Sequence, residues 1–343
     1  AGTFGQFIPA VPVLGAVRAG EHGSLIQLTQ DGQPGESGLR SNIGVLNITG
    51  EALRVTADLY GAGGEDLGVK NRNLQPFAYY QWNQVFGAGV DTVLDAYAEV
   101  SSNADPDDGA GGNTFFTYAS VVDNITGDPV YVEPPRLLTP DRPGYVPAAA
   151  RAAGVGGSFW RTDLEVHNPG PGAASYRLAL LETGGDNSSP QVSDAYTLPA
   201  GTTRRFSDML GDLFSYEGSA AVRVEVLSGT LMASSRTFTD RVGSGGGTYG
   251  QYIPCYPFNE GIFPGENAYI PQLAEHGSAD PSSADFGGFR TNVGFVNLSG
   301  ATVPVRTVLY DGDGRQVKSR SYNLKPYEHK QLNRVFGDGA EVE

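Results

Sequence analysis

The sequence contains almost no cysteine and no long apolar run. Cys255 is the only cysteine among 343 residues, so no disulfide can form within the chain. Two settings fit this composition: a reducing compartment, or a secreted bacterial protein that does without disulfides. No apolar run approaches the ~20 residues that a transmembrane helix needs, so we expect no insertion into a membrane.

Charged residues are also scarce, and those present are mostly acidic. They make up 18% of the chain, and the formal net charge is −15. An acidic surface repels phosphate groups, so we expect neither nucleic acid nor anionic lipid as a partner. The composition favours solubility and is compatible with cation binding.

Turn-forming and aromatic residues are abundant. The chain has 48 glycines and 22 prolines, and aromatic residues reach 10%. Many glycines and prolines between short β-branched and aromatic runs are typical of short strands joined by turns. The apolar content is too high for a disordered chain.

One nine-residue pattern occurs three times, at 39–47, 160–168 and 289–297. Each copy has a bulky apolar residue, an arginine, a small hydroxyl residue, Asn or Asp, and then a β-rich run that ends in Asn. An internal repeat of this kind determines the architecture before any other feature. The recurring arginines are Arg40, Arg161 and Arg290, and the closing asparagines are Asn47, Asn168 and Asn297.

The strands around the pattern predict the fold class. Apolar and polar residues alternate from Leu53 to Leu59, which is the period of a half-buried strand. About seven such strands in roughly 110 residues match the size of an immunoglobulin-like sandwich. We therefore expect an all-β protein of tandem immunoglobulin-like antiparallel β-sandwich domains, with no helix longer than about two turns.

The repeat also predicts domain boundaries. Residues near 73–87 recur near 323–337 at a constant offset of 250, so Glu343 falls opposite Val93 and the third copy is partial. The expected segments are a closing strand and linker at 1–23, sandwiches at 24–135 and 144–257, linkers at 136–143 and 258–267, and a partial sandwich at 268–343.

A second repeated stretch predicts an assembly site. Residues 2–9 recur almost unchanged at 247–254, where they close a repeat. We expect Thr3, Phe4, Gly5, Gln6, Phe7, Ile8 and Pro9 to act as a closing strand for a neighbouring repeat or for another copy of the chain. On this hypothesis, strand addition propagates a fibre, further strands must come from elsewhere, and deletion of residues 1–9 abolishes assembly.

Four phrases carry a family resemblance: GSFWRTDLEVHNPG at 157–170, FRTNVGFVNLSG at 289–300, YASVVDNITGDPVYV at 118–132 and GTYGQYIP at 247–254. They resemble the tandem immunoglobulin-like β-sandwich repeats of large secreted bacterial surface proteins of unassigned function. The resemblance covers nearly the whole chain and implies an extracellular, non-catalytic module. The bare first strand and the partial third copy depart from the family pattern.

The sequence offers few candidates for chemistry. The histidines are His22, His167, His276 and His329, and none lies at metal-ligand spacing to another. No nucleophile, base and orienting group recur together, so we expect no enzyme activity. Each recurring arginine is interpreted either as a ligand contact or, preferably, as a stacking or ion-pairing residue at a strand start. The recurring asparagines are expected to bond a turn backbone.

One acidic loop remains as a candidate metal site. Asp105, Asp107 and Asp108 have the composition of a calcium loop, but they lack the spacing and the closing Glu of the EF-hand. A solvated turn is the preferred interpretation, so no cofactor is assigned, and calcium is the alternative.

These observations leave two classes of function. The first is an extracellular structural protein, a subunit or segment of a surface layer or filament, whose partners are copies of itself or adjacent repeats. The alternative is an adhesion module that binds a glycan or a protein through loop tips or an aromatic patch.

Overall fold

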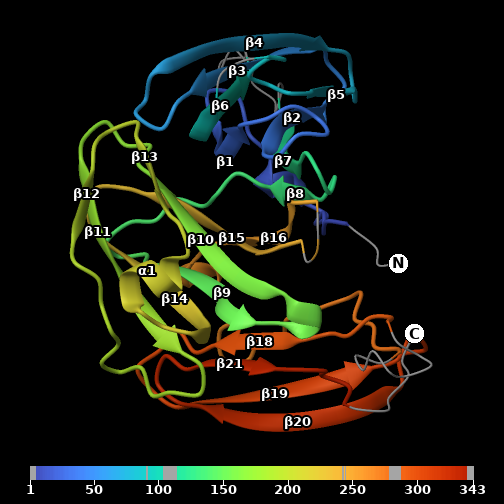
Figure 1. The fold of residues 1–343 in the computed structure, drawn as a ribbon, viewed down its shortest axis with the longest axis vertical. Coiled ribbons are helices and arrows are strands. Elements are labelled where there is room, and N and C mark those ends of the chain that lie inside the picture. The colour runs from blue at the N-terminus through green and yellow to red at the C-terminus, as the bar shows by residue number, and fades with distance from the viewer. Residues whose placement is uncertain are drawn as a thin grey trace.

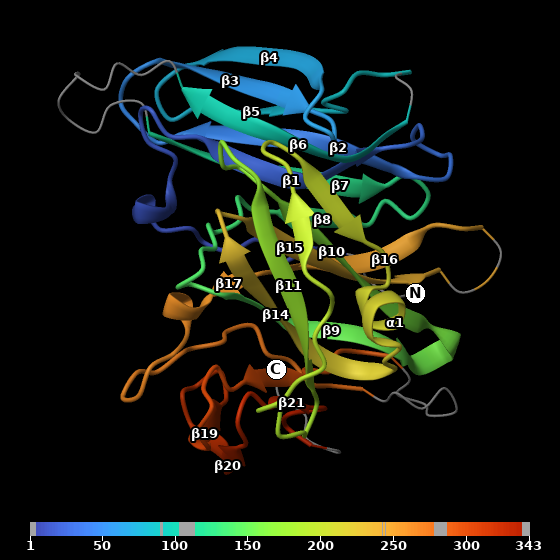
Figure 2. The same ribbon diagram turned by 90° about the vertical axis from the view of Figure 1, so that its left-hand side faces the viewer.

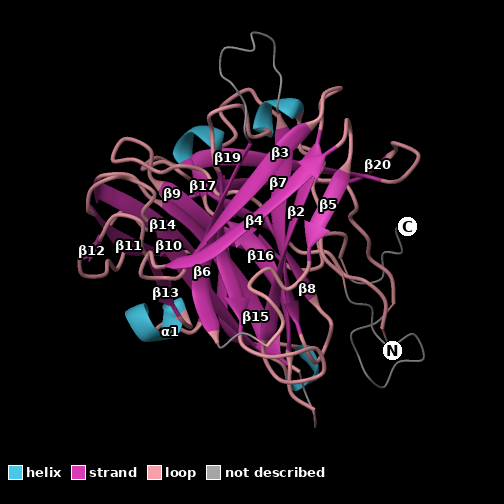
Figure 3. Cartoon of the chain, turned by 90° about the horizontal axis from the view of Figure 1, so that it is seen from above, coloured by secondary structure: helices cyan, strands magenta, loops and turns pink. Residues whose placement is uncertain are grey.

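The computed structural model describes residues 5–89, 92–102, 114–241, 243, 245–277 and 287–337. Within these residues the chain is built from antiparallel strands, and the single α-helix, α1 (Met209–Phe214), has six residues (Figure 3). The predicted all-β class and the expected shortness of helices are confirmed. No helix in the described part of the chain has the length and apolarity to cross a membrane.

The first unit contains eight strands in two four-stranded sheets, with the orders β1-β6-β3-β4 and β5-β2-β7-β8. The strands are β1 (Gly23–Gln30), β2 (Leu39–Asn47), β3 (Leu53–Tyr60), β4 (Asp66–Leu74), β5 (Tyr79–Trp82), β6 (Val93–Ser102), β7 (Phe115–Asp123) and β8 (Pro129–Val132).

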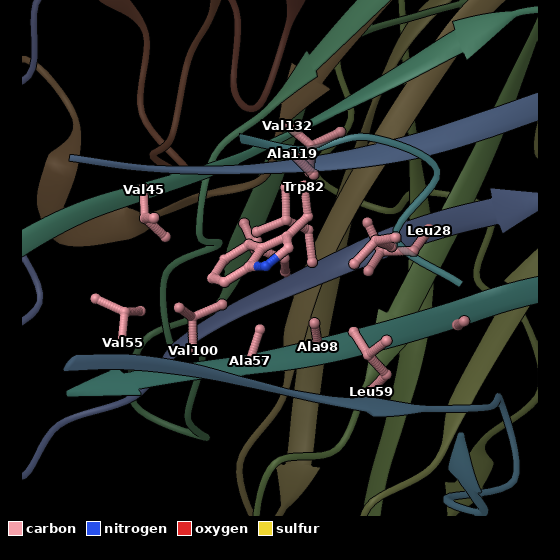
Figure 4. Close-up of a cluster of buried hydrophobic side chains, with 14 of the residues drawn as sticks. Leu28, Val45, Val55, Ala57, Leu59, Trp82, Ala98, Val100, Ala119 and Val132 are labelled. Atoms are coloured by element: carbon pink, nitrogen blue, oxygen red, sulfur yellow. The ribbon is translucent and has the colours of Figure 1, made fainter. Parts of the chain in front are cut away.

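The two sheets of the first unit pack face to face around one core. Trp82 of β5 lies between them, with side chains of β2, β7 and β8 on one side and of β3 and β6 on the other (Figure 4). The predicted alternation in β3 is present, because Leu53, Val55, Ala57 and Leu59 are buried while the residues between them are partly or fully exposed. Period-two burial thus builds the sandwich from one face of each sheet.

The second unit repeats this strand order. Its strands are β9 (Gly144–Ala153), β10 (Phe159–His167), β11 (Ala174–Glu182), β12 (Tyr196–Leu198), β13 (Thr203–Phe206), β14 (Gly218–Ser228), β15 (Met232–Asp240), β16 (Thr248–Pro254) and β17 (Tyr256–Pro257). The run β9-β14-β11-β12 matches β1-β6-β3-β4, and β13-β10-β15-β16 matches β5-β2-β7-β8. Here β9 pairs with both β14 and β10, so the two layers form one continuous nine-stranded sheet.

The third unit has four strands in the described residues: β18 (Val293–Val296), β19 (Val303–Tyr310), β20 (Gln316–Leu324) and β21 (His329–Leu332). The pairs β18-β21 and β19-β20 match β2-β5 and β3-β4 of the first unit. Its core is small, formed by Val293, Leu309, Val335 and Phe336.

The three units are stacked along the longest axis of the molecule, with the second in the middle (Figure 1). Viewed from the side, β1 and β8 of the first unit lie above β10, β15 and β16 of the second (Figure 2), and β1 contacts β10 while β16 contacts β8. On the opposite side of the second unit, β9 contacts β18 and β14 contacts β21.

The segments expected to be linkers have partial structure. The described residues before β1 contain only a 3-10 turn, Val13–Gly15, and Val17 bridges to Phe115 and belongs to the first core. Leu138, in the first expected linker, is fully buried in the core of the second unit and bridges to Leu231. A 3-10 turn, Phe258–Glu260, opens the second linker.

Candidate functional site: the interfaces between the units

The repeated pattern performs the same structural task in every unit. Asn47 accepts a hydrogen bond from the backbone N–H of Thr49 at 2.9 Å and donates to the carbonyl of Glu51 at 2.7 Å. Asn168 and Asn297 make the equivalent bonds at the ends of their own strands. The prediction that these asparagines bond a turn backbone is confirmed.

The Asn or Asp at the fourth pattern position holds a strained residue. The side-chain oxygen of Asn42 accepts the backbone N–H of Gln84 at 3.0 Å, and Gln84 has a φ of 44°. The equivalent bonds join Asp163 to Asp208 at 2.8 Å and Asn292 to Arg334 at 3.0 Å, with φ values of 42° and 49°. A left-handed non-glycine residue needs such a local bond, which explains why the pattern requires this side chain.

The hydroxyl residue of the pattern ties the pattern to an earlier segment of the same unit. Ser41 both accepts from the N–H of Thr29 and donates to its carbonyl, each at 2.8 Å. The same two-way contact joins Thr162 to Ala150 and Thr291 to Ala274. Residue 274 is therefore the counterpart of 150 and of 29, although residues 271–274 form no strand, whereas 29 lies in β1 and 150 in β9.

The pattern arginines at two positions contact their own unit. Arg161 pairs with Asp240 at 2.6 Å and lies over the ring of Phe238, with its guanidinium carbon 5.2 Å from the ring centroid. Arg40 donates to the side-chain oxygen of Asn124 at 2.8 Å. The contacts of Arg161 match the predicted stacking and ion pairing, whereas Arg40 bonds a neutral amide of its own unit.

The histidines do not gather in the structure. His22 and His276 are exposed, whereas His167 and His329 are buried. The described ranges contain no cluster of three or more His, Cys, Asp or Glu side chains arranged to hold a metal ion. The candidate calcium loop with Asp105, Asp107 and Asp108, and the assembly residues Thr3 and Phe4, lie outside the residues that the structure describes.

The remaining assembly residues are described. Residues 5–9 adopt no strand in this chain, and the side chains of Phe7 and Ile8 are exposed. Their counterpart, β16, pairs in the second unit with β15, and β15 lies between β16 and β10. Because the counterpart of β10 in the third unit is β18, a closing strand would pair there with a strand equivalent to β15, and the described residues of the third unit contain no such strand.

His167 instead marks the interface between the first and second units. Its ring lies 4.2 Å from the ring of Tyr97 in β6, centroid to centroid, and Tyr97 stacks on Tyr60 at 5.0 Å. The hydroxyl of Tyr97 donates to the carbonyl of Gly201 at 2.8 Å. Burial lowers the pKa of His167 to about 4, so the imidazole is neutral at physiological pH and serves as a packing group.

Glu165 of β10 faces the same interface. Glu165 is buried, and its carboxylate accepts the backbone N–H of Gln27 in β1 at 2.6 Å. Gln27 has a φ of 63° and lies where the pairing of β1 with β6 shifts register, so its N–H is turned away from the ladder. Burial, reinforced by the carboxylate of Asp95, raises the pKa of Glu165 to about 8.

An ion-pair network completes this interface. Arg205 of β13 pairs with Asp163 in its own unit at 2.5 Å and with Asp95 of the first unit at 3.0 Å. Burial opposes the charge of Arg205, but the two carboxylates outweigh burial and raise its pKa. Arg205 therefore joins the two units through charge-assisted hydrogen bonds to one carboxylate of each.

Acidic residues of the first unit also bind β16. The carboxylate of Asp123 accepts both the N–H of Thr248 at 2.7 Å and its hydroxyl at 2.9 Å. Asp128 accepts the N–H of Gly250 at 2.8 Å. The outer edge of the second unit is thus covered by side chains of the first, which is one way in which proteins protect a sheet edge.

The interface between the second and third units is apolar at its centre. Tyr145, Leu181 and Ala221 are buried there, and Val296, Leu298 and Tyr327 pack against them. At its border, the hydroxyl of Thr183 contacts Nδ1 of His329 at 2.6 Å, and the N–H of Gly184 donates to the carbonyl of His329 at 2.8 Å. Burial lowers the pKa of His329 to about 4.

The two interfaces use equivalent positions. The strand pairings show which residues correspond. On one side of the contact, Tyr60 and Tyr97 of the first unit correspond to Leu181 and Ala221 of the second. On the other side, the positions of the second and third units correspond in pairs: His167 to Val296, Gly201 to Tyr327 and Thr203 to His329. The turn after β3 contacts β13, because the N–H of Thr203 donates to the carbonyl of Ala62 at 2.8 Å. The turn after β11 contacts β21 in the same way, through Thr183 and Gly184.

One docking arrangement is therefore present twice with different side chains. The sequence contained a signal for it: at the outward positions of 160–168 the polar residues Asp163, Glu165 and His167 stand where the third copy has Asn292, Gly294 and Val296. These three residues are two positions apart, so their side chains lie on one face of the strand, and that face forms the interface.

Neither a protein-family model nor a curated protein matches this chain.

Proposed function

We propose that this chain is a non-catalytic structural element of an extracellular surface layer or filament, in which β-sandwich units are docked into a stiff rod. The observation that carries the proposal is the repeated docking arrangement, since the second unit presents one face to the first unit and another to the third, and equivalent positions are used at both contacts. Such a contact does not close on itself and extends a chain of units indefinitely.

The interfaces support a rigid arrangement. Fully buried side chains, a charged network and backbone hydrogen bonds join the first unit to the second, whereas a flexible chain of beads has only linkers between its units. The buried histidines support a non-catalytic role, because each fills a packing position between two units. The acidic surface and the lone cysteine are compatible with a secreted bacterial protein that does without disulfides, as the lone cysteine is with a reducing compartment.

The strand order supports an immunoglobulin-like relationship and also shows a departure from it. As in immunoglobulin sandwiches, the second strand pairs with the fifth and the third with the sixth. The seventh strand pairs with the second, where an immunoglobulin domain pairs it with the sixth. We therefore propose a variant sandwich that shares the central pairings.

Imaging of the native material tests this function. Electron microscopy of the cell surface and of material released from it, with an antibody raised against the chain, is expected to show the protein in regular filaments or a continuous layer. Isolated, flexibly beaded chains that bind immobilised glycans would contradict the proposal and favour the adhesion module.

A further inference from the structure

We infer that a second copy of the chain docks head to tail, the third unit of one copy resting on the first unit of the next through the arrangement already present twice. The inference rests on the proposed structural function and names the partner that extends the rod. Two exposed surfaces carry it, one on the first unit and one on the third.

The head surface consists of Leu46, Phe77 and Tyr79 on the sheet β5-β2-β7-β8. Phe77 is 68% exposed and Tyr79 is 56% exposed. In the second unit the same positions face the first unit and are His167, Gly201 and Thr203. In the third unit they face the second unit and are Val296, Tyr327 and His329. The head surface is therefore the one member of this series that has nothing docked on it within the described residues.

The tail surface consists of Tyr269, Tyr310 and Gly312 on the third unit. Tyr269 is 86% exposed and Tyr310 is 56% exposed. Their counterparts in the second unit are Tyr145, Leu181 and Thr183, which contact the third unit. In the first unit they are Ser24, Tyr60 and Ala62, of which Ala62 bonds Thr203 of the second unit and Tyr60 stacks on the Tyr97 that contacts it. Gln272 beside this surface has a φ of 64°, as its counterpart Gln27 has 63°.

Geometry determines which surface meets which. In both interfaces the turn after the third strand of one unit contacts the start of the fifth strand of the next, as Ala62 with Thr203 and Thr183 with His329. Applying the same relation once more sets the turn at Gly312 against Tyr79 of another copy. Large exposed aromatic side chains on both surfaces, Phe77 and Tyr79 on one and Tyr269 and Tyr310 on the other, are typical of an interaction surface.

The contact between copies is weaker than either contact within the chain. A short linker holds neighbouring units at an effective concentration of about 1 mM, and two separate copies lack this advantage. The strand that carries Tyr97 in the first unit and Ala221 in the second also has no counterpart among the described residues of the third. Assembly must therefore depend on protein concentration.

Sedimentation velocity with two blocking variants tests the inference. Tyr79→Arg blocks the head, Tyr310→Arg blocks the tail, and Leu227→Arg is a matched control at a 45% exposed apolar position outside both surfaces. Up to about 1 mM protein, the wild type and the control are expected to form species beyond the dimer. Each blocked variant alone is expected to stay monomeric, and their equimolar mixture to stop at the dimer, because one intact head meets one intact tail.

Three results would overturn the inference: a wild type that remains monomeric throughout, a control that loses assembly as fully as the blocked variants, or a mixture that stays monomeric although the wild type assembles. These results are separable from a failure of the proposed function. Native filaments without self-association of this chain would support the structural function and refute the head-to-tail partner. Self-association without native filaments would support the head-to-tail partner and refute the structural function.

Discussion

The two interfaces within the chain have the same geometry and different chemistry at their centres. The contact of the first unit with the second contains Glu165 and an Arg205 shared by two carboxylates, whereas the contact of the second with the third has Leu181 and Ala221 at its centre, and each contact includes one buried histidine. The strand faces that meet are equivalent in both. The arrangement therefore follows from the shape of the sheets and their turns, and the side chains determine how each contact responds to pH and salt.

The largest expected effect is at the apolar interface. Leu181→Asp places a carboxylate in a fully buried position that has apolar neighbours, and we expect it to lower the free energy of unfolding by about 3 kcal/mol or more and to release the third unit. Urea unfolding and limited proteolysis measure the two effects. Leu227→Asp, at an exposed position of the same unit, should change stability by less than about 0.5 kcal/mol. Equal losses for both variants would show that the interface is not formed.

A smaller effect is expected at the polar interface. Arg205→Met leaves Asp163 and Asp95 without their common partner and should cost about 2 kcal/mol, which is a modest value because a quarter of the Arg205 side chain is exposed. Adding Asp163→Asn to the variant should recover part of the loss. Urea unfolding in low and high salt gives the measurement, and salt should weaken the wild type but not the Arg205→Met variant. If the variant is as stable as the wild type, the ion-pair network does not stabilise the protein.

The pH dependence of stability separates the two chemistries further. In the folded protein Glu165 has a pKa of about 8, against an ordinary value of 4.5, so the folded state binds more protons between these values and stability falls as the pH rises through this window. His167 has its pKa lowered from 6.5 to about 4, so it makes stability rise with pH over that lower range. Between pH 6.5 and 8 only the Glu165 effect remains, with a slope of at most about 1.4 kcal/mol per pH unit.

The Glu165→Gln variant tests this assignment. It is expected to flatten the fall in stability between pH 6.5 and 8 while keeping the acceptor for the N–H of Gln27. Thermal unfolding at several pH values is the measurement, and Glu225→Gln, a carboxylate outside this interface, is the control. A slope that survives in Glu165→Gln would mean that another group titrates.

The smallest effect is expected for His167→Leu, which restores the residue found at this position in the first unit. The substitution loses the contact with Thr203, but it also removes the buried Nε2 atom, which has no hydrogen-bond partner. Because the two effects oppose each other, we expect the free energy of unfolding at pH 7 to change by no more than about 1 kcal/mol. Below pH 6 the variant should be the more stable protein, because only one buried imidazole, that of His329, then needs to charge in place of two. Acid unfolding monitored by circular dichroism gives the comparison, and identical acid curves would exclude His167 as a titrating group.

The sequence predicted the fold class and the role of the recurring asparagines, because both depend on local rules: alternation along a strand and side-chain bonds to a nearby turn. The strand order was beyond the same rules, since pairing β7 with β2 depends on contacts between residues about 75 positions apart. The interface was missed for a different reason. Asp163, Glu165 and His167 were visible as departures from the repeat, but their meaning depends on the unit that covers them, and no local pattern encodes that neighbour.

The most direct test of the central claim, that one docking arrangement recurs from unit to unit and from copy to copy, is disulfide trapping at equivalent positions. Thr183→Cys with His329→Cys in one chain is the internal reference, because these side chains are in contact, and the thiol of Cys255 is buried and does not compete. The account predicts that a Tyr79→Cys copy mixed with a Gly312→Cys copy forms a covalent dimer on mild oxidation, while Tyr79→Cys mixed with Leu227→Cys does not. If the reference pair closes and the mixed copies give no more dimer than this control, the arrangement ends within the chain and the claim is wrong.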